Sequence, residues 1–456
     1  MDKSPTDLLT EYLQGLRFED LPPDVVASAK LFLLDYLASA MAGYKINGVF
    51  NQAVWDVVGG MGGKKESRVI FRGARLPAPN AALLNAAYGH GADMDDGNRT
   101  AQGHPGVVAM SVALALAEAH DLSGKDAILA MVVGYEVFVR LATAINPSHL
   151  SRGFHTTGTV GTIAGAAAAA KALKLPLEQF RSAIGLAALQ ASGLLEVMES
   201  GQMNKPLHPA KAAFNGILAA RLAQAGSEGP REALEGKKGF VRAFSDKADL
   251  SILAKDLGKK FRISSCYIKL YPACRHVHAA IDAVLDLRQG GLPLNSLEKV
   301  KVYLYPAGIN LTGSIREPAT VDDAKFSLTY AVATALTKGR FTLDDLDVEK
   351  NFDRETRAQI AKIEVIGDPK LENREANIRG ARVELLMKDG TIRQKEVPLP
   401  KGDPEVPATP ADIENKLKFS AEGIFTEARQ QEIVKTVQKL ERLKSLGRLT
   451  RLLVIE

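Results

Sequence analysis

The chain has 456 residues, of which 46% are hydrophobic and 24% charged. This balance is typical of a globular protein with two or three domains and excludes the disordered and fibrous classes. The formal charge of +5 comes from 58 basic and 53 acidic residues. Because no basic run is interleaved with aromatic residues, nucleic acid is not an expected partner. Two cysteines, Cys266 and Cys274, cannot build a disulfide framework and are expected to be reduced thiols of a cytoplasmic protein.

Neither an export signal nor a membrane span is expected. The first twenty residues carry acids throughout and lack the basic-then-apolar order of a secretory signal. Residues 156–173 are rich in Ala, Gly and Thr and are interrupted by Lys171. This stretch is too short and too weakly apolar to cross a bilayer, so we expect a buried central helix and no membrane partner.

Helical periodicity dominates the first half of the chain. Residues 22–42 open with prolines and carry apolar residues at helical spacing, which predicts a helix that stops at Gly43. Ala- and Leu-rich segments predict further helices near 80–88, 105–120, 124–144, 157–173, 177–197 and 206–225.

The pattern changes near residue 265. Alternating apolar residues predict strands at SLEKVKVYLY and IAKIEVIG, and ARVELLMKDGTIRQKEV predicts a hairpin that turns at Asp389 and Gly390. After a proline-rich connection, an apolar stripe predicts a helix between 426 and 446. The predicted fold is mainly α: a helical domain (1–262), an inserted smaller α+β domain (263–404), and a C-terminal helical segment (405–456) that returns to the first domain.

Basic side chains recur where these helices are expected to begin. They precede the first helical residue or lie in the first turn, and they are His104, His155, Lys205, His208 and His278. A helix N-terminus binds anions through unpaired N–H groups and a positive dipole end, which also disfavours imidazolium. The pattern predicts an anionic substrate held among helix ends, with neutral histidines as bases. The alternative is that each residue is only a polar helix cap.

Acidic residues precede the first of these histidines. Asp93, Asp95 and Asp96 lie in HGADMDDGN, and Asp93 is eleven residues before His104. A carboxylate and an imidazole brought together act as base and acid, or one orients the other. The alternative is a solvated acidic turn. The spacing matches no calcium loop, so no metal site is expected.

Other residues and motifs give weaker indications of function. Arg99 and Arg275 are candidates to clamp a carboxylate, although an arginine in a polar loop is usually solvated. His90, His120 and His149 are interpreted as structural or surface residues. The chain has no dinucleotide, phosphate-loop, serine-hydrolase, zinc-hydrolase or C-x-x-C motif. No organic cofactor is therefore expected.

Six blocks occur in order along nearly the whole chain. They are HGADMDDGN…GHPG, SRGFHTTGTVGTIAGA, MNKPLHPAKAAFNG, KLYPACRHVHAAIDA, DAKFSLTYAVA and KGDPEVPATPADIENKLKF. As a set they resemble the MmgE/PrpD family, which includes 2-methylcitrate dehydratase, cis-aconitate decarboxylase and iminodisuccinate epimerase. The resemblance implies a helical domain with an α+β lid, a homodimer, and a cofactor-independent active site in the cleft between the domains.

The resemblance also implies roles for single residues. The family's active-site Asp matches Asp93, and its histidines match His104 and His155. We expect the two histidines to exchange the proton, with Asp93 as their partner. Its remaining motif residues match Lys205, His208 and His278, which we expect to bind the substrate carboxylates. Several members have Thr or Ser where this chain has Gly97, so a hydroxyl is missing there.

The function predicted from these residues is proton abstraction next to a carboxylate of a small di- or tricarboxylate. A hydro-lyase acting on a 2-methylcitrate-like hydroxy acid is the first hypothesis. An epimerase or decarboxylase on a related polycarboxylate is the enzymatic alternative, and a non-catalytic carboxylate-binding protein is the second alternative. Binding alone needs cations but no base, so the acid and the histidines favour an enzyme.

Overall fold

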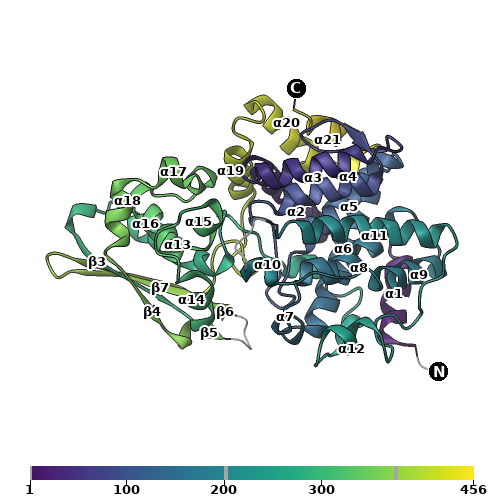
Figure 1. Ribbon diagram of the computed structural model, residues 1–456, viewed down its shortest axis with the longest axis horizontal. Helices are drawn as coiled ribbons and strands as arrows, with labels where there is room; N and C mark the ends of the chain where they lie inside the picture. The colour runs from purple at the N-terminus through teal and green to yellow at the C-terminus, as the bar shows by residue number, and fades with distance from the viewer. Residues whose placement is uncertain (1–2, 200–203, 374–377, 456) are drawn as a thin grey trace. The chain divides into compact units, whose positions relative to one another are not determined.

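The computed structural model describes residues 3–199, 204–373 and 378–455. Helices dominate these residues, which confirms the mainly α class (Figure 1). The chain divides into two compact units. Residues 1–267 and 413–456 form the first unit, and residues 268–412 form the second.

The first unit is a bundle of helices with a two-stranded ribbon, β1 (Ser67–Arg68) and β2 (Arg75–Leu76). Its helices are α1 (Pro5–Gly15), α2 (Pro23–Ile46), α3 (Gly48–Gly60), α4 (Ala78–His90), α5 (Pro105–Ala119), α6 (Gly124–Ile145), α7 (Ser148–Ser151), α8 (Thr156–Ala172), α9 (Leu177–Ala188), α10 (Glu196–Glu199), α11 (Leu207–Gln224), α12 (Phe240–Phe244), α19 (Pro410–Ala421, which begins at the end of the second unit), α20 (Glu427–Gln438) and α21 (Gly447–Leu452).

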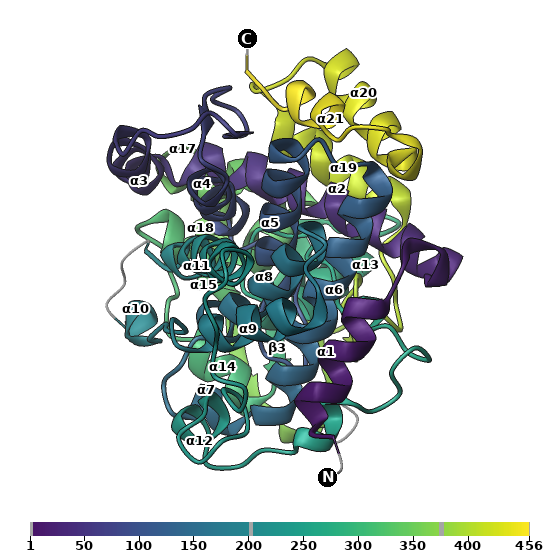
Figure 2. The same cartoon turned by 90° about the vertical axis from the view of Figure 1, so that its right-hand side faces the viewer.

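Helix α8 lies at the centre of the first unit. It contacts α5, α6, α9 and α11, as Figure 2 shows, and every residue except Lys171 is buried. Its small residues permit close packing: a Cβ added at Gly216 of α11 would lie 2.6 Å from the carbonyl carbon of Gly165 in α8. This close approach brings the first turns of α8 and α11 together. The expected buried central helix is confirmed.

Two other helices, α2 and α6, are long and apolar enough to cross a membrane by length and composition. Their most apolar windows are 72% and 89% buried within the structure. Packing in the core of the first unit therefore accounts for their apolar character.

Three predicted helix ends are wrong, each because of a tertiary contact. The helix predicted to stop at Gly43 continues to Ile46, since Gly43 permits a close crossing with α4: a Cβ there would lie 2.0 Å from the carbonyl oxygen of Tyr88. The segment predicted over 177–197 leaves its helix at Ala188, and residues 193–195 then pair with residues 153–155. The segment predicted over 426–446 leaves its helix after Gln438. Beyond this break, the carbonyl of Leu443 accepts a hydrogen bond from the N–H of Gly124.

The second unit is α+β. Its strands are β3 (Leu297–Leu304), β4 (Ile363–Gly367), β5 (Glu372–Asn373), β6 (Ile378–Arg379), β7 (Ala381–Met387) and β8 (Ile392–Val397), and its helices are α13 (Arg275–Arg288), α14 (Pro306–Thr312), α15 (Val321–Phe326), α16 (Leu328–Lys338), α17 (Val348–Asn351) and α18 (Arg354–Ile360).

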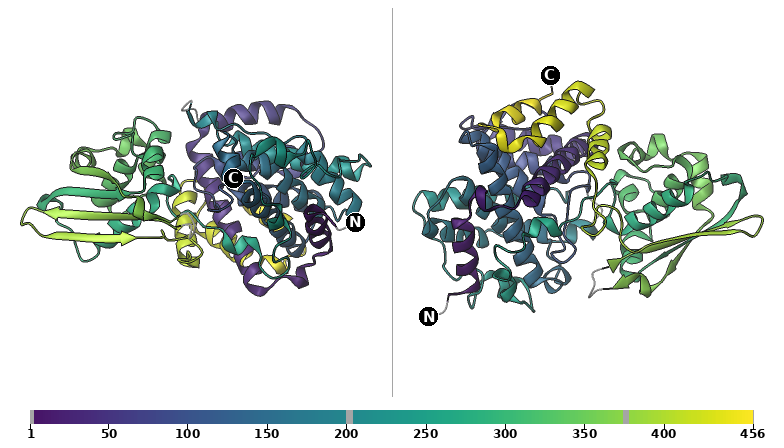
Figure 3. Two further views of the ribbon diagram at one scale, coloured as in Figure 1. Left: turned by 90° about the horizontal axis from the view of Figure 1, so that it is seen from below. Right: turned by 180° about the vertical axis from the view of Figure 1, so that it is seen from behind.

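Four of these strands form a sheet in the order β4-β3-β7-β8. β3 pairs parallel with β4 and antiparallel with β7, and β7 pairs antiparallel with β8. The predicted strands and hairpin are confirmed, and Gly390 takes the positive φ of 86° that the turn requires. α13, α14 and α16 contact strands of the sheet and lie on one face of it (Figure 3).

Candidate active site

Four helix ends of the first unit bring four histidines together. His104 precedes α5, His155 precedes α8, His208 lies in the first turn of α11, and His90 ends α4. The rings of His90 and His104 are 4.8 Å apart between centroids, and those of His155 and His208 are 5.0 Å apart. His90 and His155, 6.0 Å apart, join the two pairs. We call His90, His104, His155 and His208 the histidine cluster.

His155 and His208 face each other through Nδ1 atoms that are 2.8 Å apart. A contact this short between two ring nitrogens needs one proton, so one ring donates and the other accepts. Burial, followed by the charge of Lys205, holds the pKa of His155 well below its usual range. Burial also lowers the pKa of His208 to about 4. Both rings are therefore neutral near pH 7, as their positions at helix starts predict.

Lys205 and Asp93 form an ion pair beside the cluster. Nζ of Lys205 donates to Oδ1 of Asp93 at 2.6 Å, and the two side chains are 19% and 8% exposed. Asp93 has a φ of +50°, a left-handed conformation that Asp adopts more readily than most residues. Its N–H donates to the carbonyl of His90, so the chain turns immediately after α4. This turn directs the carboxylate of Asp93 toward the start of α11.

His104 has a defined tautomer. Its Nδ1 lies 2.8 Å from the carbonyl oxygen of Asp96, and because a carbonyl only accepts, the proton is on Nδ1. The lone pair is therefore on Nε2, the form required of a general base. The backbone N–H of His104 donates to the hydroxyl of Thr157 in α8, at 3.1 Å, which fixes the start of α5 against the start of α8.

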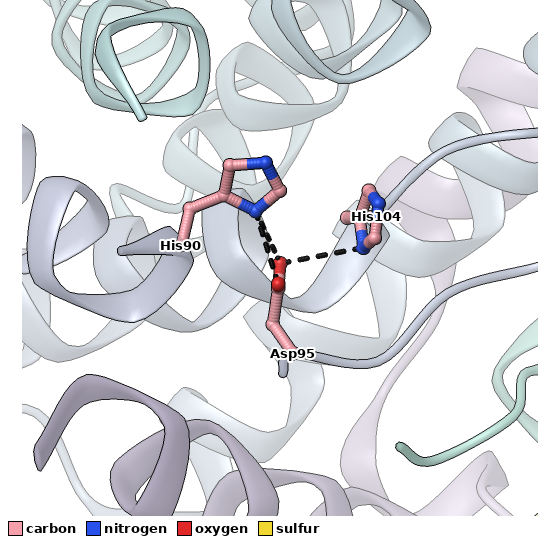
Figure 4. A group of neighbouring side chains, drawn as sticks. All are labelled: His90, Asp95 and His104. Atoms are coloured by element: carbon pink, nitrogen blue, oxygen red, sulfur yellow. Dashed lines mark hydrogen bonds and ion pairs between the residues drawn. The ribbon is translucent and has the colours of Figure 1, made fainter. Parts of the chain in front are cut away.

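His90 and Asp95 join this arrangement, although sequence reasoning did not assign them to the site. Nδ1 of His90 lies 3.0 and 2.8 Å from the two carboxylate oxygens of Asp95. One of these oxygens is 3.5 Å from Nδ1 of His104, so the carboxylate lies between the two rings (Figure 4). The interpretation of His90 as a structural or surface residue was incomplete: it is fully buried and belongs to the cluster. His90 ends a helix, so it lacks the helix-start signal that marks His104 and His155.

His90, Asp95 and His104 are also of types that bind metal ions, and their candidate ligand atoms lie within 4.8 Å of one another. As arranged, however, Nδ1 of His104 donates to a carbonyl and Nδ1 of His90 faces a carboxylate as a donor. Both nitrogens use a proton where a metal requires a lone pair. These three residues therefore fit a hydrogen-bonded group better than a metal site.

The acidic loop is buried, so the alternative of a solvated turn is wrong. Asp93, Asp95 and Asp96 are 5%, 1% and 3% exposed. Asp96 accepts hydrogen bonds from the hydroxyl of Tyr135 and the N–H of Gly106, at 2.9 and 3.1 Å. Burial and then the negative charge of neighbouring acids raise the pKa of Asp96 well above its usual range. Its side chain supports the loop through these two hydrogen bonds.

Two domain families match the sequence: the MmgE/PrpD N-terminal domain over residues 7–253 and the MmgE/PrpD C-terminal domain over residues 271–442. The chain belongs to the MmgE/PrpD family. The sequence is 28% identical to a cis-aconitate decarboxylase of Aspergillus terreus, over 98% of this chain and 95% of that protein. It is 27% identical to the cis-aconitate decarboxylase of Homo sapiens, over 99% and 95%. This member of the MmgE/PrpD family thus aligns with enzymes along nearly its whole length.

The glycine in the acidic loop of this MmgE/PrpD protein has a physical cause. Gly97 and Tyr267 exchange backbone hydrogen bonds, at 3.0 and 2.7 Å. A Cβ at Gly97 would lie 2.4 Å from the hydroxyl oxygen of Tyr267. The ring of Tyr267 therefore occupies the space in which a Thr or Ser side chain would lie, and it places a phenol beside the loop.

Three further residues, Arg99, Arg275 and His278, are predicted to bind substrate. Arg99 is half-buried in the loop of the first unit. Arg275 and His278 belong to the second unit, where Arg275 pairs with Asp403 at 3.0 Å and donates to Nδ1 of His278 at 3.1 Å. Nε2 of the fully buried His278 donates to the carbonyl of Ala273. Substrate binding by these three residues stays a prediction.

Proposed function

We propose that this protein is a lyase that removes carbon dioxide from a small unsaturated tricarboxylate of the cis-aconitate type. The names of its curated relatives support decarboxylation over the loss of water that the sequence alone suggested first. A decarboxylase is a carbon–carbon lyase, whereas a hydro-lyase breaks a carbon–oxygen bond. Both reactions, and epimerisation, require a proton to move to or from a carbon next to a carboxylate.

In the proposed reaction the bond between carbon and one carboxylate breaks, and its electron pair stays on the carbon skeleton. Carbon dioxide leaves, and one proton is added to carbon. Lys205, already near the acid–base residues, binds a remaining carboxylate and stabilises the charge that develops in the transition state. His104 and His155 carry the proton, with Asp93 beside Lys205 and with His208 sharing a proton with His155.

The observation that carries this proposal is the histidine cluster next to a lysine. His104 has its lone pair on Nε2, and the pKa of His155 lies well below its usual range because the ring is buried. Neutral imidazoles at helix starts are suited to proton transfer, and the adjacent cation is suited to carboxylate binding. A protein that only binds carboxylates has no use for the shared proton of His155 and His208.

The experiment is incubation of the purified protein with cis-aconitate, a 2-methylcitrate-like hydroxy acid and other polycarboxylates. Products are identified by NMR and mass spectrometry. Loss of carbon dioxide from cis-aconitate is expected. Loss of water from the hydroxy acid would replace the proposal with a hydro-lyase, and binding without any turnover would support the carboxylate-binding alternative. Lys205→Met is the inactive control, because it removes the cation with little change in length.

A further inference from the structure

Asp95 is the most buried acid of the loop between α4 and α5. The proposed proton transfer assigns no role to its side chain. Its side chain is 1% exposed. Its nearest described polar neighbours in the cluster are Nδ1 of His90, at 2.8 and 3.0 Å, and Nδ1 of His104, at 3.5 Å. A buried carboxylate is costly unless donors or opposite charges face it. The imidazole of His90 supplies a donor here, and the ring of His104 lies next to the carboxylate.

The position relative to His104 is specific. The carbonyl of Asp96 already accepts the Nδ1 proton of His104 and fixes the tautomer. The carboxylate of Asp95, further away at 3.5 Å, adds negative charge on the same side of the ring. When Nε2 takes up a proton, the ring becomes an imidazolium with this carboxylate 3.5 Å from its Nδ1. The charge pair then stabilises the protonated state.

We propose that Asp95 is a positioning residue of the reaction: it orients His90 and His104 and stabilises the imidazolium that forms on His104 during proton transfer. This inference rests on the proposed function, because it assigns the proton transfer to His104. His90 completes the arrangement. It donates its Nδ1 proton to Asp95, and within the described residues its buried Nε2 has no hydrogen-bond partner. The T-shaped contact of its ring with that of His104, at 71°, holds both rings in place.

The groups that influence His104 lie on several elements. Asp95 and the backbone of Asp96 are in the loop, and His90 is at the end of α4. His155, at the start of α8, interacts electrostatically with both His104 and Lys205. Of these neighbours, Asp95 supplies the negative charge closest to the ring, so removing this charge should act on His104 more than on His155.

The test compares Asp95→Asn with Asp56→Asn. Asn has the shape of Asp without its charge. Asp56 is an exposed acid of α3 outside the cluster, so Asp56→Asn removes the same charge from the protein and leaves the loop unchanged. Steady-state kinetics and a ¹⁵N NMR titration of the histidine rings are measured on each variant after circular dichroism confirms folding. We expect Asp95→Asn to lower kcat at least about tenfold, with KM within about threefold. The midpoint of His104 should fall by about one pH unit, and Asp56→Asn should change neither kcat nor this midpoint.

Two further results decide whether Asp95 acts on His104. In the wild-type protein, which needs no variant to fold, His104 should titrate at higher pH than His155 and His208; titration at or below theirs would overturn the inference. A folded Asp95→Asn with normal kcat and an unchanged His104 midpoint would overturn it as well. If the wild type converts no polycarboxylate, the proposed function fails, but the NMR comparison still decides whether Asp95 acts on His104.

Discussion

Lys205 and Asp93 are 112 positions apart in the sequence, yet Nζ and Oδ1 lie 2.6 Å from each other in a largely buried ion pair. The pair connects the start of α11 to the loop that follows α4. It therefore places a cation beside the histidine cluster, and it gives Asp93 a role in stability as well as in the site.

Replacement of Lys205 by Met should affect both stability and catalysis. It leaves the mostly buried carboxylate of Asp93 without this cation, which should lower the free energy of unfolding by about 3 kcal/mol. Because the charge of Lys205 binds the substrate carboxylate in both the ground state and the transition state, its loss should raise KM and lower kcat. Denaturant titration and steady-state kinetics measure the two effects.

The double variant Lys205→Met/Asp93→Asn separates the effect of Lys205 on stability from its effect on catalysis. Asn tolerates the left-handed conformation of residue 93 and removes the uncompensated charge, so most of the lost stability should return while activity stays low. Recovery of activity in the double variant would show that Lys205 serves only to neutralise Asp93.

His104→Ala should lower kcat by about two to four orders of magnitude, the range expected for the loss of an acid–base group. KM should change much less, because Lys205 still binds the carboxylates. His120→Ala is the matched control: His120 follows α5, the helix that His104 precedes, about 24 Å away by the rise of a helix. A His104→Ala protein with near-normal kcat would return this residue to the role of a helix cap.

Exhaustive chelation should leave turnover unchanged. The Nδ1 atoms of His90 and His104 are used as hydrogen-bond donors, so the group with Asp95 has no lone pairs there for a metal. The measurement is kcat before and after treatment with EDTA and passage over a chelating resin. Loss of activity that a divalent ion restores would show that the metal-compatible arrangement of these residues is occupied during catalysis.

Acidification should lower the stability of the fold because it protonates His149, a residue outside the cluster. Burial lowers its pKa to about 4, and its ring is held by the carbonyl of Phe244 and the hydroxyl of Thr159. Since its pKa in the unfolded chain is about 6.5, the unfolded state binds the proton first. The neutral ring contributes fully above about pH 6.5, and this contribution is lost as the pH falls toward 4, at a cost of about 2.5 kcal/mol between about pH 7.5 and 4.5.

His149→Gln keeps a donor and an acceptor but does not titrate. Denaturant titrations of both proteins at the two pH values measure the difference, and the variant should lose less stability on acidification than the wild type by roughly that amount. Equal losses in the two proteins would mean that His149 does not contribute to the acid sensitivity.

Local signals predicted much of the fold and part of the site. Helices such as α5 and α6 were found within a residue or two, because capping residues and apolar periodicity are local. The extension of α2 past Gly43 and the early end of α9 depend on contacts with distant segments, which periodicity does not contain. The same holds for the site: His104 and His155 have a helix-start signal, whereas His90 is recognisable only once the turn at Asp93 brings Asp95 back to it.

The central claim is that the histidine cluster moves a proton to or from the carbon of a polycarboxylate. The most direct measurement is incubation of the protein with cis-aconitate in deuterated water, with the product analysed by NMR and mass spectrometry. We expect carbon dioxide to be lost and one deuterium to appear on the carbon skeleton, with the rate reduced in His104→Ala but not in His120→Ala. A product without carbon-bound deuterium, or no reaction and no exchange with any polycarboxylate tested, would contradict the account.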